Sequence, residues 1–480
     1  MNRKLIVHLL GYLLLFEALF MLPSLFVALL YGDGDAMAFV YTLAALVPVG
    51  LLLSRVKPDR NEMEARDGLA VSGLAWMLLS AFGALPFLFS GMTTRYIDAF
   101  FECVSGFTTT GATILSQVEG NGRGVLFWRS FTHWIGGMGV LVLTLALMPN
   151  LTGRATHLAR AESPGPTFSK FTPRLRDTAK VLYKIYIFMT AVQVVLLIWA
   201  GLPVYDSFLH AFGTAGTGGF SNRNLSVGAY GLPMVEVIIT VFMLLFGVNF
   251  AVYFHLLRRE FRLARRNEEV VIYFGIALAS IALATWQLMP RYGDFFTSLR
   301  YASFQVASIM STTGYCTTDF NLWPQFVRAL LVLLMLIGSC AGSTAGGLKV
   351  VRVTLLIKSS AREVMHAFRP RKTAVVRMDG KSVSETVVGQ LGAFLFLYCA
   401  LLSVGTLLLS LYGYDLETSF TAPIACLSNI GPGLAVVGPM GSFAPFSPLC
   451  KLYLSMLMLA GRLEFFPILA LLYPSMWRKR

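Results

Sequence analysis

Four short segments of the sequence each combine an aspartate, an apolar stretch and a cluster of Thr, Ser, Asn and Gly. They cover residues 96–115, 204–222, 292–320 and 413–435. Their clusters align on one glycine as Thr109-Thr110-Gly111, Gly216-Thr217-Gly218, Thr312-Thr313-Gly314 and Asn429-Ile430-Gly431. Glycine permits backbone angles that turn carbonyl oxygens toward a shared centre. Because such carbonyls can replace the hydration shell of a monovalent cation, the four clusters predict a site for a dehydrated cation.

The segments that flank these clusters are suited to lipid. The chain has 480 residues, of which 56% are hydrophobic and 13% charged, and its mean hydropathy is +0.67. Soluble domains carry about 25% charged residues, and a helix needs about 20 apolar residues to cross a bilayer. The sequence predicts ten spans, at 5–30, 36–53, 68–88, 126–148, 182–202, 234–257, 270–289, 326–356, 387–411 and 451–473. We therefore expect an all-α polytopic membrane protein.

The aspartates explain how the clusters reach the middle of the membrane. Aspartate is a good N-cap and complements the positive charge at a helix start, so Asp98, Asp206, Asp294 and Asp415 are expected to begin four half-helices near the outer surface. Each half-helix then points its negative C-terminal end at mid-membrane. Irregular backbone at that depth must line protein or a water-filled cavity. The unit is span, half-helix, glycine loop and span, and its recurrence at intervals of about 100 residues indicates internal duplication.

Basic residues indicate the orientation of the chain. The net charge is +14, and with the N-terminus inside, the cytoplasmic segments hold 29 Lys and Arg against 8 on the outer side, where Arg129 and Lys451 are placed. This asymmetry follows the positive-inside rule, and a basic inner surface also suits anionic lipid or a cytosolic partner. We expect both termini in the cytoplasm and no binding of nucleic acid. The six cysteines form no C-x-x-C pair, and the six histidines form no H-E-x-x-H motif, so no enzyme is predicted.

The motifs resemble the Trk/Ktr/HKT superfamily of potassium transporters, and most closely its TrkH-type membrane subunits. TTTGAT at 108–113, GTAGTGGFS at 213–221, STTGYCTTDF at 311–320 and NIGPGL at 429–434 carry the resemblance. It implies four repeats in pseudo-fourfold symmetry around one central pore, after two extra N-terminal helices. The expected division is 1–67 for those helices and the first cytoplasmic loop, then 68–180, 181–269, 270–385 and 386–480 for the repeats.

The resemblance also implies roles for the clusters. The selectivity filter and potassium sites are expected at Thr109, Thr110, Gly111, Thr217, Gly218, Thr312, Thr313, Gly314, Asn429, Ile430 and Gly431. Sodium-preferring relatives often have Ser at the first of the four glycine positions, whereas this chain has Gly111, so potassium is the expected ion. Small residues that allow close helix packing are the alternative explanation for any single glycine.

A second motif, LIGSCAGSTAGGLKVVR at 336–352, interrupts the eighth predicted span and resembles the intramembrane gating loop of the family. The expected loop is 338–347, and the gating residues are Gly338, Gly342, Ser343, Thr344, Gly346, Gly347 and Lys349. Ser339 stands where the family usually has a second glycine. Each glycine would cost a regular helix about 1 kcal/mol relative to Ala, so a break is expected, although a packing groove of small residues is the alternative.

Arg462 is expected deep in the last span, where an unpaired charge costs several kcal/mol. In the resembling family an arginine at this place lies below the filter, beside the gating loop. Glu464 is two residues away and would not face it on a helix, so Arg462 is expected to oppose cations. Pairing with carbonyls of the broken helix is the alternative.

The expected function is potassium uptake across the bacterial inner membrane, with potassium as the substrate and the bound metal, and with no covalent cofactor. The family implies symport, a homodimer, and regulation by a peripheral cytosolic nucleotide-binding subunit of the TrkA type. The alternative is an inverted-repeat symporter for another small cation or solute, which would show two broken helices in opposite topology rather than four units in register.

Overall fold

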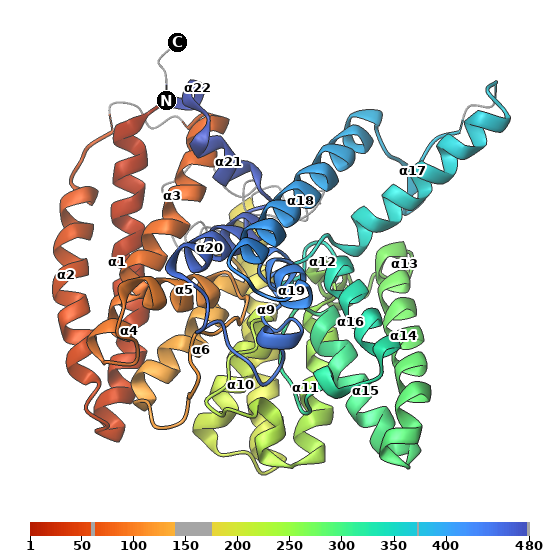
Figure 1. Ribbon diagram of the computed structural model, residues 1–480. Coiled ribbons are helices and arrows are strands. Elements are labelled where there is room, and N and C mark those ends of the chain that lie inside the picture. Colours follow the sequence, from red (N-terminus) through yellow and green to blue (C-terminus); the bar gives the residue numbers. More distant parts are fainter. Residues whose placement is uncertain (59–62, 140–174, 372–373, 478–480) are drawn as a thin grey trace.

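The computed structural model describes residues 1–58, 63–139, 175–371 and 374–477, and within these ranges the chain is almost entirely helical (Figure 1). One antiparallel pair of very short strands is present, β1 (Arg377–Met378) with β2 (Lys381–Ser382). The prediction of an all-α polytopic fold is confirmed. The minor elements include two small helices, α13 (Phe261–Arg265) and α22 (Pro474–Trp477). They also include the 3₁₀ turns η1 (Ser226–Tyr230), η2 (Phe320–Leu322) and η3 (Ala435–Val437).

Six helical stretches of the described chain are long and apolar enough to cross a bilayer. They are α1 (Arg3–Tyr31), α2 (Ala36–Ser54), α3 with α4 (Ala65–Gly83 and Leu85–Phe89), α9 (Leu175–Trp199), α14 (Glu268–Tyr292) and α18 (Glu385–Leu411). Each coincides with a predicted span. The division between repeats stays a prediction, and its boundaries fall within the first two turns of α3, α9, α14 and α18.

The remaining predicted spans are interrupted. Helix α11 (Pro233–Phe246) meets α12 (Phe250–Leu257) at a bend of 91°, and α20 (Pro448–Arg462) is followed by a separate α21 (Phe466–Leu472). The prediction of one continuous helix is wrong at both places, because backbone at Gly247–Asn249 and Leu463–Phe465 leaves the helix. The predicted break in the eighth span is present between α16 (Gln325–Ile337) and α17 (Val350–Phe368). Helix α6 (Arg123–Gly137) begins the fourth span, whose later part lies outside the described residues.

Four half-helices lie between the first and second helices of the repeats. They are α5 (Tyr96–Phe107), α10 (Val204–Gly216), α15 (Phe295–Met310) and α19 (Leu416–Leu427). The helices α1 and α2 form a layer on one side of this assembly, where α1 packs on α3 and α6, and α2 packs on α4 (Figure 1). Two N-terminal helices followed by four similar units are therefore present, as predicted.

The predicted aspartate caps are present in two half-helices. Asp294 accepts a hydrogen bond of 2.8 Å from the Thr297 N–H, and Asp415 accepts one of 3.0 Å from the Thr418 N–H. The Thr297 N–H and hydroxyl lower the pKa of Asp294 from its ordinary value. Asp98 and Asp206 are not N-caps, because α5 and α10 begin earlier in the chain and place them in the first turn. Their charges still complement the helix starts.

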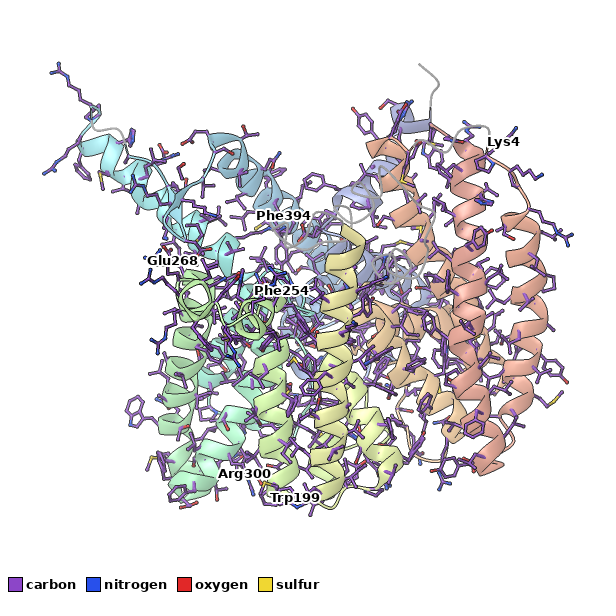
Figure 2. All side chains as sticks on the ribbon, turned by 180° about the vertical axis from the view of Figure 1, so that it is seen from behind. Lys4, Trp199, Phe254, Glu268, Arg300 and Phe394 are labelled. Carbon is purple, nitrogen blue, oxygen red and sulfur yellow. The ribbon has the colours of Figure 1, made fainter. Side chains whose placement is uncertain are left out.

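The two ends of the described chain lie together. The Arg3 guanidinium donates a hydrogen bond of 3.1 Å to the Trp477 carbonyl, which joins α1 to α22. Figure 2 shows Lys4 at the opposite end of the molecule from Trp199 and Arg300. Helix α17 projects from the body at the end where α22 lies (Figure 1), and its last residue, Phe368, is 82% exposed.

Glycines allow the second helices of two repeats to touch the ends of their half-helices. A Cβ on Gly136 of α6 would lie 1.9 Å from the carbonyl oxygen of Phe107, the last residue of α5. A Cβ on Gly461 of α20 would lie 2.0 Å from the carbonyl oxygen of Leu427, the last residue of α19. No side chain fits at either contact without a backbone shift.

We predict that Gly136→Ala destabilises the folded protein by about 1–3 kcal/mol, because relieving the overlap requires α6 and α5 to separate. Thermal unfolding of the purified protein in detergent measures this effect. Gly392→Ala in α18 is the matched control, because a Cβ there meets nothing within 4 Å. An alanine in an exposed helix is neutral or favourable by up to about 1 kcal/mol. Equal stability of the two variants would contradict the close packing of α6 on α5.

Candidate ion-conduction site

The four half-helices end in the same backbone conformation. Each is followed by one residue in the left-handed region, namely Thr109 (φ 55°), Thr217 (φ 56°), Thr312 (φ 57°) and Asn429 (φ 54°). All four residues are fully buried. Two residues later each loop has a glycine with positive φ, namely Gly111 (78°), Gly219 (77°), Gly314 (85°) and Gly431 (99°). The loops are therefore four copies of one local structure, at positions predicted from the sequence except in the second repeat.

The alignment of Gly218 with Gly111 is wrong by one residue. The N–H of Gly218 donates to the Gly213 carbonyl at 2.8 Å, as the N–H of Thr110 donates to the Ser105 carbonyl at 2.9 Å. Gly218 therefore matches Thr110, and Gly219 matches Gly111. The sequence alignment was ambiguous here because Gly218 and Gly219 are adjacent, and either can be aligned with Gly111. The spacing from the aspartate does not resolve it, because the ring glycine follows Asp98 by 13 residues, Asp294 by 20 and Asp415 by 16.

The four loops close into a ring through contacts that only glycine permits. A Cβ on Gly111 would lie 1.8 Å from the Gly218 carbonyl oxygen, which belongs to the next repeat. The same relation continues around the chain. A Cβ on Gly219 would lie 2.0 Å from the Thr313 oxygen, one on Gly314 would lie 2.1 Å from the Ile430 oxygen, and one on Gly431 would lie 2.7 Å from the Thr110 oxygen. Each repeat thus touches the next, and the fourth returns to the first.

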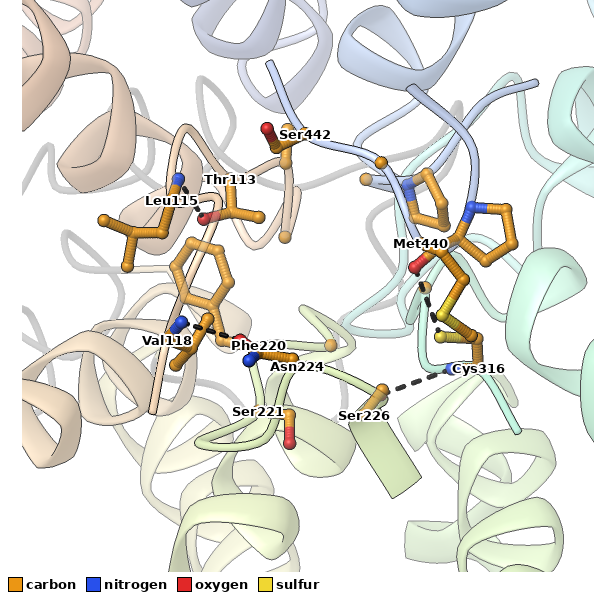
Figure 3. A pocket seen from close by; sticks show the side chains of 18 of the residues that line it. Thr113, Leu115, Val118, Phe220, Ser221, Asn224, Ser226, Cys316, Met440 and Ser442 are labelled. Atoms are coloured by element: carbon orange, nitrogen blue, oxygen red, sulfur yellow. Dashed lines mark hydrogen bonds between the residues drawn. The ribbon is translucent and has the colours of Figure 1, made fainter. Parts of the chain in front are cut away.

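A cavity of about 250 Å³ opens on one side of the ring. Its lining includes all four positive-φ glycines, Gly111, Gly219, Gly314 and Gly431. Most of the remaining lining comes from the segments that follow these glycines, and Arg129 of α6 adds to it. Figure 3 shows side chains from several repeats around the cavity, among them Thr113, Ser221 and Met440. The cavity is a vestibule that leads to the ring.

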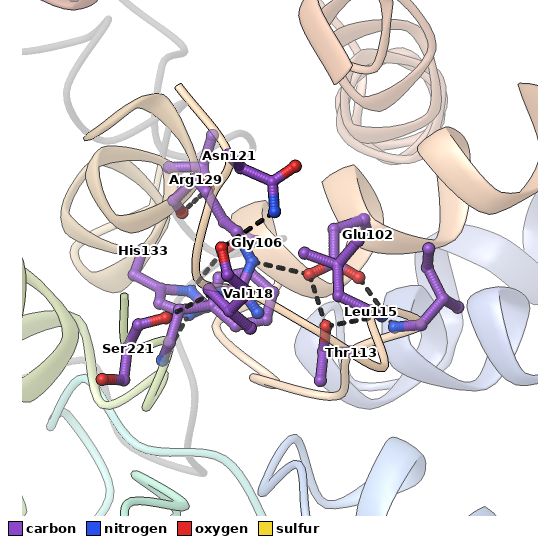
Figure 4. Close-up of polar contacts among 12 residues, drawn as sticks. Glu102, Gly106, Thr113, Leu115, Val118, Asn121, Arg129, His133 and Ser221 are labelled. Atoms are coloured by element: carbon purple, nitrogen blue, oxygen red, sulfur yellow. Dashed lines mark hydrogen bonds and ion pairs between the residues drawn. The ribbon is translucent and has the colours of Figure 1, made fainter. Parts of the chain in front are cut away.

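A buried ion pair holds the first two loops. Glu102 of α5 and Arg129 of α6 are 2.6 Å apart, with side chains at most 3% exposed. Glu102 also accepts from the Thr113 hydroxyl at 2.8 Å and the Ile114 N–H at 2.9 Å. Arg129 donates to the Ser221 carbonyl at 2.9 Å, and its guanidinium lies 3.5 Å from the Phe220 ring centroid (Figure 4). The pair fixes the backbone after Gly111 to that after Gly219.

Arg129 borders the vestibule, in line with its expected place near a pore-loop mouth, but its side chain is buried against Glu102, which was not expected. Neither residue was among the predicted site residues. A Glu inside a predicted half-helix and an Arg inside a predicted span were signals for a buried pair, because isolated charges are costly in membrane interiors.

Other polar contacts join each repeat to its neighbours. His133 of α6 bonds the Gly106 carbonyl at 2.8 Å and accepts the Phe220 N–H at 3.3 Å. The Tyr315 hydroxyl donates to the His210 carbonyl at 3.1 Å, between the third and second repeats. The Asn429 amide donates to the Thr110 hydroxyl at 2.9 Å, between the fourth and first. Asn321 bridges the third and fourth through Ala435.

The segment 338–349 lies against the other side of the ring. The Gly346 N–H donates to the Thr312 hydroxyl at 2.7 Å, and the Ser339 hydroxyl donates to the Met310 carbonyl at 2.8 Å. A Cβ on Gly346 would lie 2.2 Å from the Ser428 carbonyl oxygen. The segment therefore contacts residues that precede the ring glycines in the third and fourth repeats. Gly338, Gly342, Gly347 and Lys349 have positive φ, so the break is built from these residues.

Other contacts fix this segment to neighbouring helices. The Cys340 N–H donates to the Gly247 carbonyl at 3.1 Å, and the Gly342 carbonyl accepts from the Phe250 N–H at 3.0 Å. Glu269 of α14 accepts the N–H groups of Ala341 and Val351. Of the predicted gating residues, Ser343 bonds the carbonyl of Cys340, Thr344 that of Phe246, and Lys349 that of Ala345.

Arg462 is the last residue of α20 and connects the first repeat to this segment. Its guanidinium donates to the carbonyls of Thr344 at 2.7 Å, Gly136 at 2.5 Å and Gly137 at 2.7 Å. Glu464 pairs with Arg352 at 2.5 Å, in line with the expectation that it does not face Arg462. Bonds to carbonyls at helix breaks are therefore present, and they place a guanidinium beside the intramembrane segment.

The fold and the ring define a class, the membrane proteins in which four re-entrant loops of one chain surround a central path. A family model described as cation transport protein, TrkH, matches residues 36–274 and 294–478. The chain belongs to the TrkH family, as its motifs predicted.

Curated relatives match over the whole length. The chain is 37% identical to "Trk system potassium uptake protein TrkH" of Salmonella typhimurium LT2 and 35% identical to the protein of that name from Escherichia coli K12, with 100% of each chain covered. It superimposes on the crystal structure of the potassium transporter TrkH from Vibrio parahaemolyticus with a TM-score of 0.89, at 33% identity and full coverage of both chains.

The Glu102–Arg129 pair generates a test by a double-mutant cycle. Arg129→Gln leaves a buried carboxylate without its cation, and we expect a loss of about 3–5 kcal/mol of stability. Glu102→Gln should also destabilise. The double variant Glu102→Gln/Arg129→Gln should lose clearly less than the sum of the single losses, because neither partner is left charged and alone. Additive losses in the unfolding of the three purified variants would show that the two groups act independently.

Proposed function

We propose that this chain is the potassium-conducting subunit of a Trk uptake system. The observation that carries the proposal is the ring, in which each positive-φ glycine lies against a carbonyl oxygen of the next repeat. The selectivity filter comprises Thr109, Thr110, Gly111, Thr217, Gly218, Gly219, Thr312, Thr313, Gly314, Asn429, Ile430 and Gly431. Potassium is the substrate, and transport rather than enzymatic chemistry is the activity.

The ring supplies what a dehydrated cation needs. The carbonyl oxygens of Thr110, Gly218, Thr313 and Ile430 each lie at a junction between two repeats, and such oxygens can replace water around the ion. The four half-helices end at the ring, so their negative C-terminal ends favour a cation there. Hydrogen bonds that Arg129, Tyr315 and Asn429 donate, and one that His133 accepts from the Phe220 N–H, hold the loops, so the spacing of the oxygens is set by the fold.

Segment 338–349 and Arg462 form the gate in this proposal. The segment crosses the path directly after the ring, since it contacts Thr312 and Ser428 at the ends of two half-helices. A fixed positive charge about 6 Å from the path opposes a monovalent cation by about 3 kcal/mol at an effective dielectric constant of about 20. Arg462 therefore both holds the segment closed, through Thr344, and repels the ion.

The proposed function includes an orientation of the chain in the membrane and partner proteins. Both termini face the cytoplasm of the bacterial inner membrane, which is supported by their common end and by the basic residues of α17 and the hairpin after it. The projecting α17 offers a surface to a cytosolic nucleotide-binding subunit of the TrkA type. We propose a homodimer in lipid, and symport as the mode of transport, because the family resemblance implies them.

The alternative of an inverted-repeat symporter is less well supported. Such a transporter would place two broken helices in opposite topology. Here four half-helices end in residues of the same conformation, and their loops contact one another in chain order. Four units in register favour a channel-like path.

We predict that Gly111→Ser lowers the preference for potassium over sodium by on the order of tenfold, or about 1.4 kcal/mol, because its Cβ displaces the Gly218 carbonyl. Rubidium uptake with sodium competition, in cells lacking other potassium transporters, measures this preference. Gly219→Ser should act alike. Gly120→Ser is the matched control, because Gly120 also has positive φ but meets nothing within 4 Å. An unchanged preference in Gly111→Ser would refute the filter assignment.

We predict that Arg462→Gln raises basal potassium flux, because it removes the charge and at least part of the hydrogen bonding to Thr344, Gly136 and Gly137. Loss of about 3 kcal/mol of repulsion corresponds to about a hundredfold in rate. The potassium preference should stay as in the wild type, and Arg462→Lys, which keeps the charge, should stay nearer to wild-type flux. The measurement is potassium flux into proteoliposomes that contain the wild type or either variant. Unaltered flux, or loss of folding, would make Arg462 a structural anchor only.

A further inference from the structure

Another buried carboxyl lies in α1, outside the conduction site. Glu17 is 3% exposed, and neither of its carboxyl oxygens has a hydrogen-bond partner among the residues that the structure describes. Helix α1 is 29 residues long, and Glu17 lies near its middle, between Phe16 and Ala18. This position is far from either end of a membrane-spanning helix, so the carboxyl cannot reach water by extending along the helix.

The carboxyl lies against the half-helix of the first repeat. A Cβ on Gly83 of α3 would lie 2.8 Å from each of three atoms, Glu17 Oε1, Cys103 Sγ and Phe107 Cε2. These atoms therefore converge where α1, α3 and α5 meet. Cys103 and Phe107 belong to α5, which also carries Glu102. Glu17 is thus packed on the half-helix that supports the first filter loop.

No base is hydrogen-bonded to this acid in the part of the chain that the structure describes. The titratable side chains near Glu17 include Cys103 and Tyr96, both of α5. The Tyr96 hydroxyl donates instead to the Ala81 carbonyl at 2.9 Å. Glu102 is also buried, but its carboxylate has partners, because it pairs with Arg129 and accepts hydrogen bonds from Thr113 and Ile114.

An ionised carboxylate at this position would be buried without a cation or a donor, at a cost of several kcal/mol. We propose that Glu17 is a proton-binding site, which carries its proton as a neutral carboxylic acid in the folded protein at neutral pH. Loss of that proton would require water or a donor to enter between α1 and α5. Occupancy of the site by a proton is therefore linked to the packing of the half-helix behind the filter.

Infrared difference spectroscopy of the full-length protein in lipid tests the proposal without reference to potassium transport. The wild type minus Glu17→Gln spectrum at neutral pH should show a carboxylic acid C=O band that shifts in D₂O and is lost in the variant. Gln is close in shape to the protonated acid, so the variant should fold and keep the uptake rate of the wild type. A difference spectrum with carboxylate bands alone would overturn the proposal.

Labelling with dicyclohexylcarbodiimide provides a second measurement with an internal control. This apolar reagent adds to protonated carboxyl groups, and its whole mass is retained in the N-acylurea product. Mass spectrometry of the labelled wild type should find the adduct on the peptide that contains Glu17 and not on the one that contains Glu102. An adduct on Glu102 with Glu17 unmodified would contradict the assignment of the two protonation states.

Discussion

The ring of loops depends on four contacts between backbone atoms, in which Gly111, Gly219, Gly314 and Gly431 each lie against a carbonyl of the following repeat. Every other amino acid would place a Cβ inside van der Waals distance of that oxygen. Every other amino acid would also be strained at φ angles of 77° to 99°. A single requirement, close approach of four loops, therefore explains both the residue type and the backbone conformation. It also explains why the repeats cannot slide relative to one another without opening the ring.

In the proposed filter, the four carbonyl oxygens at the junctions repel one another when no cation is present, so the ring needs support from outside. The supporting groups differ at each junction: an arginine and a histidine between the first two repeats, a tyrosine between the second and third, and asparagines at the other two. Buried hydrogen bonds of this kind are strong in a medium of low dielectric constant. The symmetry of the backbone is thus maintained by side chains that do not themselves repeat.

Local patterns predicted much of this structure. Hydropathy predicted the spans that form α1, α2, α14 and α18. Motif spacing predicted three of the four ring glycines, and the cost of glycine in a helix predicted the break at Gly338. Contacts between distant residues could not be predicted in this way. The burial of Arg129 was not predicted because its partner Glu102 is 27 residues away in the sequence. The bend after Phe246 was missed because a hydropathy window records composition and not direction. Gly219 was missed because adjacent glycines give equally good alignments, and the positive φ of Gly219 and the i−5 hydrogen bond of Gly218 are visible only in the structure.

In the proposed function, the ring of carbonyls binds the transported ion without its water. The most direct measurement is a crystal structure of this protein soaked in thallium or rubidium, with anomalous scattering used to locate the ion. A carbonyl filter should give a peak at the centre of the ring, in contact with the carbonyl oxygens of Thr110, Gly218, Thr313 and Ile430. Ions found only in the vestibule lined by Thr113, Ser221 and Met440, with none within the ring, would contradict it.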